Sequence, residues 1–358
     1  MKSYLYAIGL VAILAACSTS NSETTSTKPQ SRGQLYEVLV VMDSALWKHE
    51  LGDSLRSVFA PIIPGLPQDE PYLDLRHVNP LGFNDLLKQS RNIIFLATLD
   101  QKSAMNRSIL NNFSANSLQI IKEDTTRFMM VKKDDFAKGQ TVLYLFGQNS
   151  EILMRHLAKN PKGLRDVVLK GEKERVFDAL YNNKEQTGLQ EELTNKFGGF
   201  VRIPNGYKVA DNQSDFVWLR HPEKEVDRNI FMAVKPYTNE AAFHPDSIIA
   251  WREQITKKYI YGDPENKESY VTIQKVVPPV SQILNDVEVY TVETRGLWQT
   301  NTISMGGPFI SHVLVDKQAG TMYYIEGFVY APSKDKREYM VEMETILRTF
   351  KERVQTGA

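Results

Sequence analysis

Tyr36-Glu37-Val38-Leu39-Val40-Val41-Met42 is the stretch that decides the fold, and Asp43-Ser44 follows it directly. The run is β-rich and nearly continuous in apolar side chains, a pattern typical of a strand that is covered on both faces. Asp43-Ser44 supplies an N-cap for a helix that carries Trp47, Leu51 and Leu55 on one side. A buried strand that leads into an amphipathic helix predicts the start of an α/β domain.

The same alternation continues along the chain. Strands are predicted at residues 72–78 and 92–97, with a short helix at 81–88 between them. Residues 128–131 and 142–146 add two further strands to the sheet. Strands separated by helices favour a mostly parallel sheet.

A long helical region is predicted from about residue 149 to residue 196, with one break at Pro161 and Gly163. Thr187-Gly188-Leu189-Gln190 resembles a capping box that opens its last helix, and Gly198-Gly199 ends that helix. We place the domain boundary here, with an N-terminal α/β domain at 35–198 and a C-terminal domain at 199–358.

The C-terminal domain reads as short strands with two helices. Asp246 is predicted to cap the first helix, and the second begins after Ser333. Gly320 ends the short loop of a hairpin and is expected in a left-handed conformation. Strands are expected at residues 215–219, 229–235, 270–277, 287–293, 309–315 and 321–330. The pattern predicts an α+β fold in which helices pack on one face of an antiparallel sheet.

The amino-terminal segment predicts an exported, lipid-anchored protein. Residues 4–16 are an apolar run of signal-peptide length, and Leu14-Ala15-Ala16-Cys17 resembles the bacterial lipobox. The resemblance implies that residues 1–16 are removed and that Cys17 is lipidated. The alternative is an ordinary signal peptide with an accidental cysteine. Residues 17–34 are polar and predict a flexible tether.

Ser18, the residue after Cys17, bears on which membrane holds the protein. Ser18 replaces the Asp that signals inner-membrane retention in enterobacteria, and no acidic run follows it. We therefore expect an outer-membrane lipoprotein that faces the periplasm.

Composition excludes several classes of function. Acidic and basic residues balance at 43 each, so net charge favours no nucleic-acid partner. Cys17 is the single cysteine, which leaves the mature body without an internal disulfide, a zinc–sulfur site or a cysteine nucleophile. The six histidines lack metal-ligand spacing, and no cofactor motif occurs. We expect no cofactor and no metal.

Four further stretches, together with the lipobox, resemble an uncharacterised lipoprotein family of Bacteroidota, domain of unknown function 4837. They are Arg295-Gly296-Leu297-Trp298, Met305-Gly306-Gly307-Pro308-Phe309, Glu326-Gly327-Phe328-Val329-Tyr330-Ala331-Pro332 and Lys336-Arg337-Glu338-Tyr339-Met340. The likeness covers nearly the whole mature chain. It implies a lineage and a compartment, and no activity or substrate.

The best candidate for a binding site is the stretch from Arg295 onward. Arg295 offers a planar fork for carboxylate or phosphate, and Trp298 offers a stacking face for a sugar or an aromatic partner. His312 and Glu326, with Glu288 and Glu293, lie on neighbouring predicted strands and are expected to converge there. The alternative is structural: Trp298 belongs to the core, the glycines make a turn or bulge, and Arg295 pairs with a carboxylate.

These observations favour a non-enzymatic envelope protein. We expect it to bind a partner or ligand at the outer membrane through its second domain. The alternative is a hydrolase of envelope polymers that uses paired carboxylates such as Glu288 and Glu326.

Four tripeptides match the O-glycosylation pattern of exported Bacteroidota proteins, in which Asp precedes Ser or Thr. They are Asp43-Ser44-Ala45, Asp53-Ser54-Leu55, Asp124-Thr125-Thr126 and Asp246-Ser247-Ile248. Helix capping explains two of them equally well. We predict glycosylation at Thr125, which falls in a polar loop.

Overall fold

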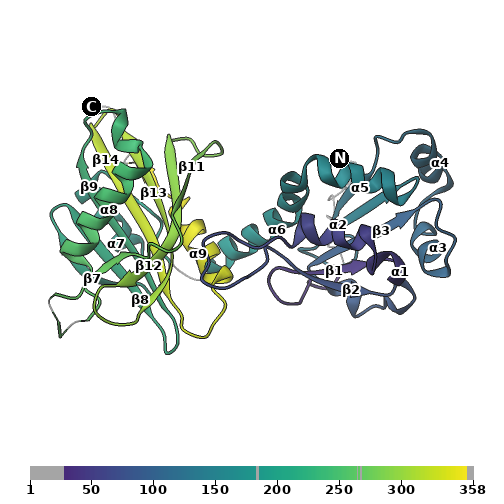
Figure 1. The fold of residues 1–358 in the computed structure, drawn as a ribbon, viewed down its shortest axis with the longest axis horizontal. Coiled ribbons are helices and arrows are strands. Elements are labelled where there is room, and N and C mark those ends of the chain that lie inside the picture. Colours follow the sequence, from purple (N-terminus) through teal and green to yellow (C-terminus); the bar gives the residue numbers. More distant parts are fainter. Residues whose placement is uncertain (1–27, 183–184, 264, 267, 353–358) are drawn as a thin grey trace, which may run out of the picture.

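Two lobes, each built on its own sheet, make up the molecule (Figure 1). The computed structural model describes residues 28–182, 185–263, 265–266 and 268–352. The predicted signal peptide, Cys17 and residues 18–27 lie outside this part. Within it, no helix combines the length and apolarity needed to span a membrane.

The N-terminal lobe contains the predicted parallel sheet, in the order β2-β1-β3-β5-β4. The first four strands of that order are parallel, and β4 pairs antiparallel with β5 at the edge. The strands are β1 (Glu37–Val41), β2 (Asp74–Val78), β3 (Asn92–Thr98), β4 (Met129–Lys133) and β5 (Thr141–Gly147). β3 and β5 are buried along their whole length, as expected for a sheet covered on both sides.

Helices cover both faces of this sheet. One core packs α2, α5 and α6 against Val38, Val40 and Ile94, and the other packs α3 and α4 against Leu39 and Ile93. The helices are α1 (Ser44–Trp47), α2 (Glu50–Phe59), α3 (Ala104–Leu110), α4 (Ala115–Glu123), α5 (Ser150–Lys159) and α6 (Pro161–Tyr181).

Two predictions about the N-terminal lobe are wrong. The helix expected at 81–88 is a pair of short 3₁₀ turns, Pro80–Gly82 and Leu87–Gln89. The tether predicted at residues 17–34 is too long, because the backbone of Ser31 and Arg32 already forms hydrogen bonds with the N-terminal lobe. Helices α3 and α4 had not been predicted, since they bury few apolar residues.

The C-terminal lobe contains an antiparallel sheet in the order β10-β12-β13-β14-β9-β8-β7, with β11 also paired to β12. The predicted α+β class is confirmed. The strands are β7 (Lys208–Gln213), β8 (Phe216–Pro222), β9 (Asp227–Pro236), β10 (Val271–Ile273), β11 (Val280–Leu284), β12 (Thr291–Thr300), β13 (Gly306–Asp316) and β14 (Thr321–Tyr330). A small second ladder joins β6 (Gly199–Phe200) to β15 (Lys351–Glu352). Gly320 has φ 64°, as the hairpin prediction requires.

Helices of this lobe pack on both faces of the sheet, which corrects the expectation of one covered face. α8 (Pro245–Tyr259) packs against Phe216 and Trp218, whereas α7 (Thr187–Phe197) and α9 (Arg337–Leu347) pack against Val217 and Leu219. Successive side chains of a strand point to opposite faces, and here both sets are apolar.

Three details at helix ends also differ. Leu193 and Phe197 of α7 belong to the C-terminal core, so the lobe boundary lies between α6 and α7 rather than at residue 198. Thr187 is the first residue of α7 and does not cap it. α8 begins at Pro245, so Asp246 lies in its first turn instead of capping it. Gly198 ends α7 with φ 83°, as predicted.

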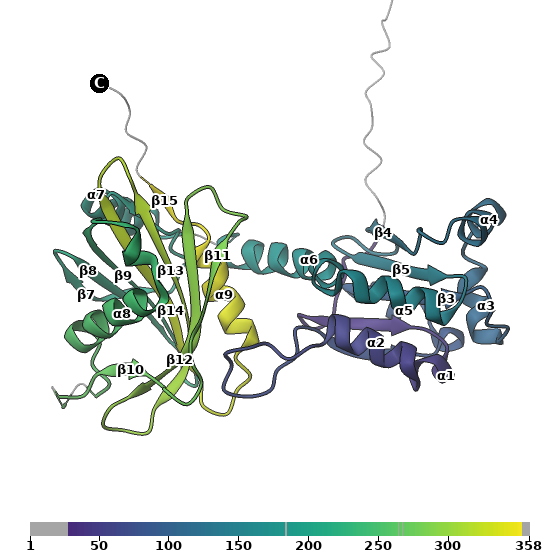
Figure 2. The ribbon, with the colours of Figure 1, turned by 45° about the horizontal axis from the view of Figure 1, so that its top comes forward.

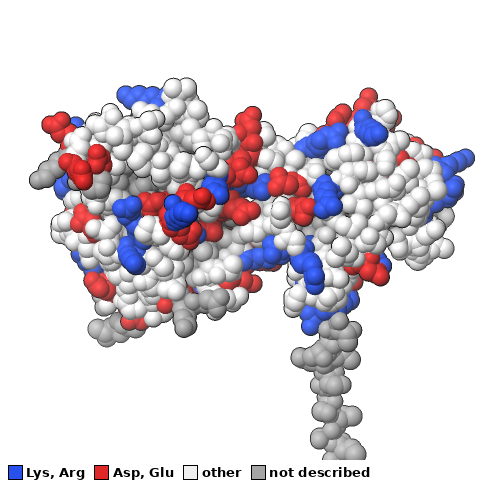
Figure 3. All heavy atoms as spheres, turned by 90° about the horizontal axis from the view of Figure 1, so that it is seen from below, with Lys and Arg blue, Asp and Glu red and all other residues white. Residues whose placement is uncertain are grey.

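Helices α6 and α9 connect the lobes. α6 leaves the N-terminal lobe and reaches α9, which lies against the C-terminal sheet (Figure 2). Leu180 of α6 packs against the cores of both lobes. Acidic and basic side chains gather on the surface where the lobes meet (Figure 3).

Candidate functional site

Strand β12 separates the predicted site residues onto two faces of the sheet. Arg295 lies on the α9 side with Glu293 and His312, because His312 is the register partner of Glu293. Trp298 and Glu326 lie on the α8 side, where Trp298 belongs to the core. The predicted convergence is therefore only partly right: Arg295 and His312 meet at Glu293, whereas Trp298 and Glu326 lie on the opposite face.

On the α8 side, Glu326 is committed to an ion pair. Its two oxygens accept from Nε and Nη2 of Arg252 at 2.8 and 2.7 Å, and both residues are almost fully buried. Glu288 is exposed in the turn before β12. Glu288 and Glu326 therefore do not face each other across a cleft.

The glycines after Trp298 serve packing within the sheet. A Cβ on Gly307 would lie 2.1 Å from the carbonyl oxygen of Val329 and 3.1 Å from Nε1 of Trp298. The close backbone approach is thus made to a neighbouring strand. Trp298 belongs to the core, as the structural alternative assigned it. Gly306 and Gly307 instead lie in strand β13, in regular register with β12, and do not make the turn or bulge of that alternative.

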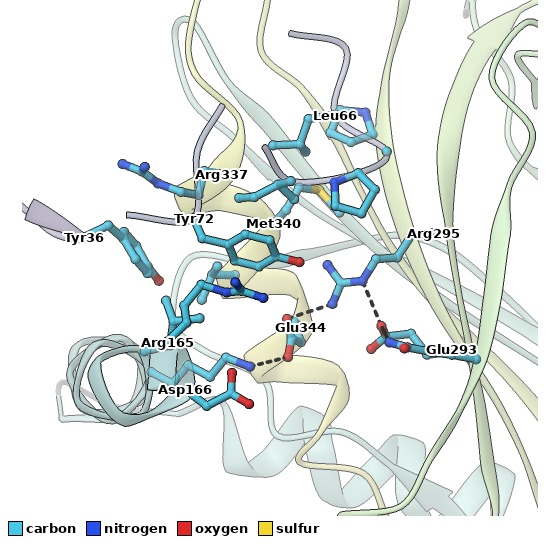
Figure 4. A pocket seen from close by; sticks show the side chains of 18 of the residues that line it. Tyr36, Leu66, Tyr72, Arg165, Asp166, Glu293, Arg295, Arg337, Met340 and Glu344 are labelled. Carbon is cyan, nitrogen blue, oxygen red and sulfur yellow. Dashed lines mark hydrogen bonds and ion pairs between the residues drawn. The ribbon is translucent and has the colours of Figure 1, made fainter. Parts of the chain in front are cut away.

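On the α9 side, Arg295 faces a cleft between the lobes, which we call the interlobe cleft (Figure 4). Its volume is about 190 Å³. The N-terminal lobe contributes Tyr36, Tyr72 and Arg165, and the C-terminal lobe contributes Arg295 and Glu344. The cleft exists only where the two lobes meet.

A chain of ion pairs runs along this cleft. Arg295 donates from Nε to Glu293 at 2.8 Å and from Nη2 to Glu344 at 2.8 Å. Glu344 also accepts from Lys173 of α6 at 2.7 Å and from Arg348 at 3.1 Å. The chain therefore joins β12, α9 and α6.

These ion pairs keep the carboxylates of Glu293 and Glu344 ionised. Burial alone would raise the pKa of Glu344, but Arg295 and Lys173 hold it at about 2. Burial likewise opposes ionisation of Glu293, yet His312 and Arg295 lower its pKa below the ordinary value. Burial also acts against the charge of Arg295, while Glu344 and Glu293 raise its pKa. The pairs are mutually stabilising.

Basic residues outnumber acidic ones around the interlobe cleft. The basic lining residues are Lys162, Arg165, Lys173, Arg295, Arg337 and Arg348, and the acidic ones are Asp166, Glu293 and Glu344. Among the described residues, Arg165 is the lining cation without a carboxylate partner. It donates from Nη1 to the carbonyl of Val58 at 2.8 Å and lies over the ring of Tyr72.

Tyr36 is a second lining residue with a hydrogen-bond donor that has no acceptor in the described structure. Its side chain is 1% exposed, and its hydroxyl has no hydrogen-bond partner in the described structure. Burial raises its pKa well above the ordinary value, so the hydroxyl keeps its proton. Its backbone has φ 64°, which is strained for a tyrosine, and buried Glu172 accepts from its N–H at 3.2 Å.

Sequence reasoning had not identified Tyr36, Arg165, Lys173 or Glu344 as site residues. Tyr36 and Arg165 were interpreted only as parts of a strand and a helix. They lie far apart in sequence from Arg295, and no local motif connects them.

Two further predicted features can be placed. Thr125 is exposed between α4 and β4, next to Asp124, which accepts from the backbone and hydroxyl of Thr126. Among the described residues, no group of three or more His, Cys, Asp or Glu side chains is arranged to hold a metal.

Three solved structures resemble this chain weakly. A mutant of protein Mog1 is 9% identical and covers 43% of this chain and 90% of its own, with a TM-score of 0.29. The Saccharomyces cerevisiae Ran-binding protein Mog1p is 10% identical, with the same coverage and TM-score. The human StarD13 (DLC2) lipid transfer and protein localization domain is 8% identical and covers 45% of this chain and 95% of its own, with a TM-score of 0.21. These scores are too low to carry an argument.

Family models divide the chain where the lobes divide. No curated protein matches the sequence. Residues 31–180 match a domain of unknown function (DUF8532), and residues 186–349 match another (DUF4837). The second match is the family whose motifs were recognised, although it spans the C-terminal lobe and not nearly the whole mature chain. Residues 186–349 of this protein match the model of the DUF4837 family.

Proposed function

We propose that this protein is a lipid-anchored envelope protein that binds a small anionic group in the interlobe cleft. The observation that carries the proposal is Arg165, a cation of the cleft that has no carboxylate partner among the described residues. A guanidinium without a counter-ion favours a phosphate or carboxylate that can accept from its fork.

The surroundings of Arg165 support an anion in the same place. Tyr36 supplies a protonated hydroxyl donor, and six basic residues against three acidic ones line the cleft. The cleft is smaller than a typical drug-sized pocket. We therefore assign it a single phosphate or carboxylate group, either free or at the end of a larger envelope molecule.

The chemistry of the cleft carboxylates favours binding over hydrolysis. A general acid that works near neutral pH needs a raised pKa. The pKa values of Glu293 and Glu344 are lowered instead, and both groups already accept from cations. The hydrolase hypothesis stays a second candidate, but Glu288 and Glu326, the pair named for it, do not face each other in the described structure.

The lipid anchor and periplasm-facing location are part of the proposal and rest on the sequence around Cys17. A body held at the membrane by a tether can meet ligands that diffuse in the periplasm or belong to the envelope itself. The fold of the second lobe does not by itself define the partner.

Calorimetric titration of the full-length lipoprotein in detergent tests the proposal. The probes are inorganic phosphate, glycerol phosphate and succinate, which distinguish free phosphate, a phosphate ester and a carboxylate. At least one should bind saturably, and Arg165→Gln should weaken that binding roughly tenfold or more. Arg155→Gln is the matched control, because Arg155 is 67% exposed and pairs only with Glu151 in the described structure.

Tyr36→Phe is a second variant that separates binding from folding. It removes a hydroxyl that has no partner in the described protein, so the melting temperature should not fall. Anion affinity should drop about two- to tenfold. Absence of saturable binding with all three probes, or equal losses in Arg165→Gln and Arg155→Gln, would rule the proposal out.

A further inference from the structure

A second pocket lies on the opposite face of the C-terminal sheet, past the end of α8. A helix of 15 residues such as α8 is about 22 Å long, whereas strands of 10 residues such as β9, β12 and β14 extend about 33 Å. The helix ends at Tyr259 and leaves part of the strand face uncovered. This uncovered end is hollowed into a cavity of about 480 Å³, which we call the aromatic pocket.

Aromatic rings line the aromatic pocket. Trp218 and Trp298 are each 3% exposed and form its inner wall, while Tyr261 is 43% exposed and lies edge-on to Trp218 with ring centroids 5.3 Å apart. Phe328 and Tyr330 complete the set of rings. Both indole N–H groups already have acceptors, Asn229 Oδ1 for Trp218 and the carbonyl of Val329 for Trp298. The rings therefore present apolar surface to the pocket.

A polar pair lies beside these rings. Arg220 donates from Nη2 to Oδ2 of Asp227 at 2.6 Å. Nε of Arg220 and Oδ1 of Asp227 are buried and have no partner within the described residues. Buried polar atoms are rarely left without partners, so each such atom calls for an explanation. Here one donor and one acceptor remain on adjacent side chains in a single pocket.

The charge of the aromatic pocket differs from that of the interlobe cleft. Its charged lining residues are Arg220, Asp227 and Asp263, and Arg220 is neutralised by its ion pair with Asp227. An anion would meet an excess of negative charge here. A neutral ligand that offers both hydroxyl donors and acceptors fits better.

We propose that the aromatic pocket binds a neutral pyranose sugar. A pyranose has an apolar face of C–H groups that can stack on an aromatic ring, and its hydroxyls each donate and accept. Tyr261 is the exposed ring that stacks on the sugar. Two hydroxyls of the sugar accept from Nε of Arg220 and donate to Oδ1 of Asp227, which satisfies both unpartnered atoms.

This site is independent of the proposed function of the interlobe cleft. Strand β12 contributes to both, with Arg295 facing the cleft and Trp298 facing the aromatic pocket. The strand thus separates an anion site on one face from a sugar site on the other.

The test uses full-length lipoprotein in detergent and a panel of methyl glycopyranosides with the gluco, galacto, manno and N-acetylglucosamine configurations, together with their trisaccharides. Binding is followed by saturation-transfer NMR and by intrinsic tryptophan fluorescence, since Trp218 and Trp298 line the pocket. We expect saturable binding of at least one configuration. Tyr261→Ala should weaken it about tenfold, and Tyr261→Phe should retain most of it.

Tyr290→Ala is the matched control, because Tyr290 is 46% exposed and packs on Phe243 outside the pocket. It should leave sugar binding unchanged, as should Arg165→Gln in the other site. The inference is overturned if no glycoside binds saturably, or if Tyr261→Ala matches wild type while remaining folded by circular dichroism. Equal weakening by Tyr261→Ala and Tyr290→Ala would also overturn it.

Discussion

Glu70 of the N-terminal lobe caps helix α9 of the C-terminal lobe at Lys336, 266 positions further along the chain. Its carboxylate accepts from the backbone N–H of Lys336 at 2.8 and 2.9 Å and from that of Arg337 at 2.7 Å. The side chain of Lys336, the N-cap residue, makes no capping bond in the described structure. A carboxylate at a helix N-terminus satisfies free N–H groups and interacts favourably with the helix dipole. One lobe therefore completes a helix of the other.

Glu70→Ala should destabilise the protein by about 2–3 kcal/mol, because it leaves buried N–H groups of α9 without an acceptor. Urea unfolding measures the loss. Asp69→Ala removes the neighbouring, exposed carboxylate and should change stability by less than about 0.5 kcal/mol. Similar effects of the two substitutions would show that Glu70 does not act as a cap.

Acid should weaken the contact between the lobes. The pKa of Glu344 is lowered from 4.5 to about 2 in the folded protein, so its ionised form is stabilised by folding. This contribution is present above about pH 4.5 and is lost as pH falls toward 2. Its size is of the order of 3 kcal/mol. Thermal unfolding between pH 7 and pH 3 should show the decline.

Glu344→Gln provides the control for that experiment. The variant should be less stable than wild type at pH 7, since Lys173 and Arg348 lose a charged partner, and its stability should fall less steeply with acid. An unchanged pH dependence would mean that Glu344 is not responsible.

Changing one partner of the buried ion pair between Arg252 and Glu326 should destabilise the protein more than changing both partners. Glu326→Gln leaves Arg252 with a weakened partner in the core and should cost roughly 3–5 kcal/mol. The double variant Arg252→Met with Glu326→Gln should recover part of this loss. A thermodynamic cycle by urea unfolding measures the coupling, with exposed Glu151→Gln as the control. Additive losses would exclude a coupled pair.

Cys17→Ala should abolish lipid labelling and cleavage of the signal peptide at this site, because the thiol that would carry the lipid is gone. Labelled fatty acid and membrane fractionation check both effects, and circular dichroism of the body should not change. Recovery of a lipidated variant in the outer membrane would contradict the lipobox interpretation.

Thr125 should carry a glycan in the native host, since it is exposed and lies in an Asp-Thr-Thr stretch. Intact-mass analysis of protein purified from the host should show added mass that Thr125→Ala removes. A native mass equal to that of the unmodified chain would leave the turn made by Asp124 as the sufficient role of this stretch.

Local pattern was enough to predict much of the secondary structure. The apolar runs at β1, β3 and β5 predicted a buried parallel sheet, and Gly198 and Gly320 marked turns that need positive φ. Helices α3 and α4 were missed because both are short and each buries a single apolar residue, Ile109 in α3 and Ile121 in α4. The faces covered by α8 and α9 could not be predicted, since strands such as β8 are apolar on both sides.

By itself, the sequence determined the α/β and α+β classes and the likeness of residues 186–349 to the DUF4837 family, because strand and helix periodicities and short motifs are local properties. Only the tertiary structure decided which side chains share a site. Arg295 and Trp298 are three residues apart on one strand, yet the pleat directs them to opposite faces. Tyr36 and Arg165 line the same cleft as Arg295 because α6 and α9 hold the lobes together, and contacts between lobes leave no local pattern in the chain.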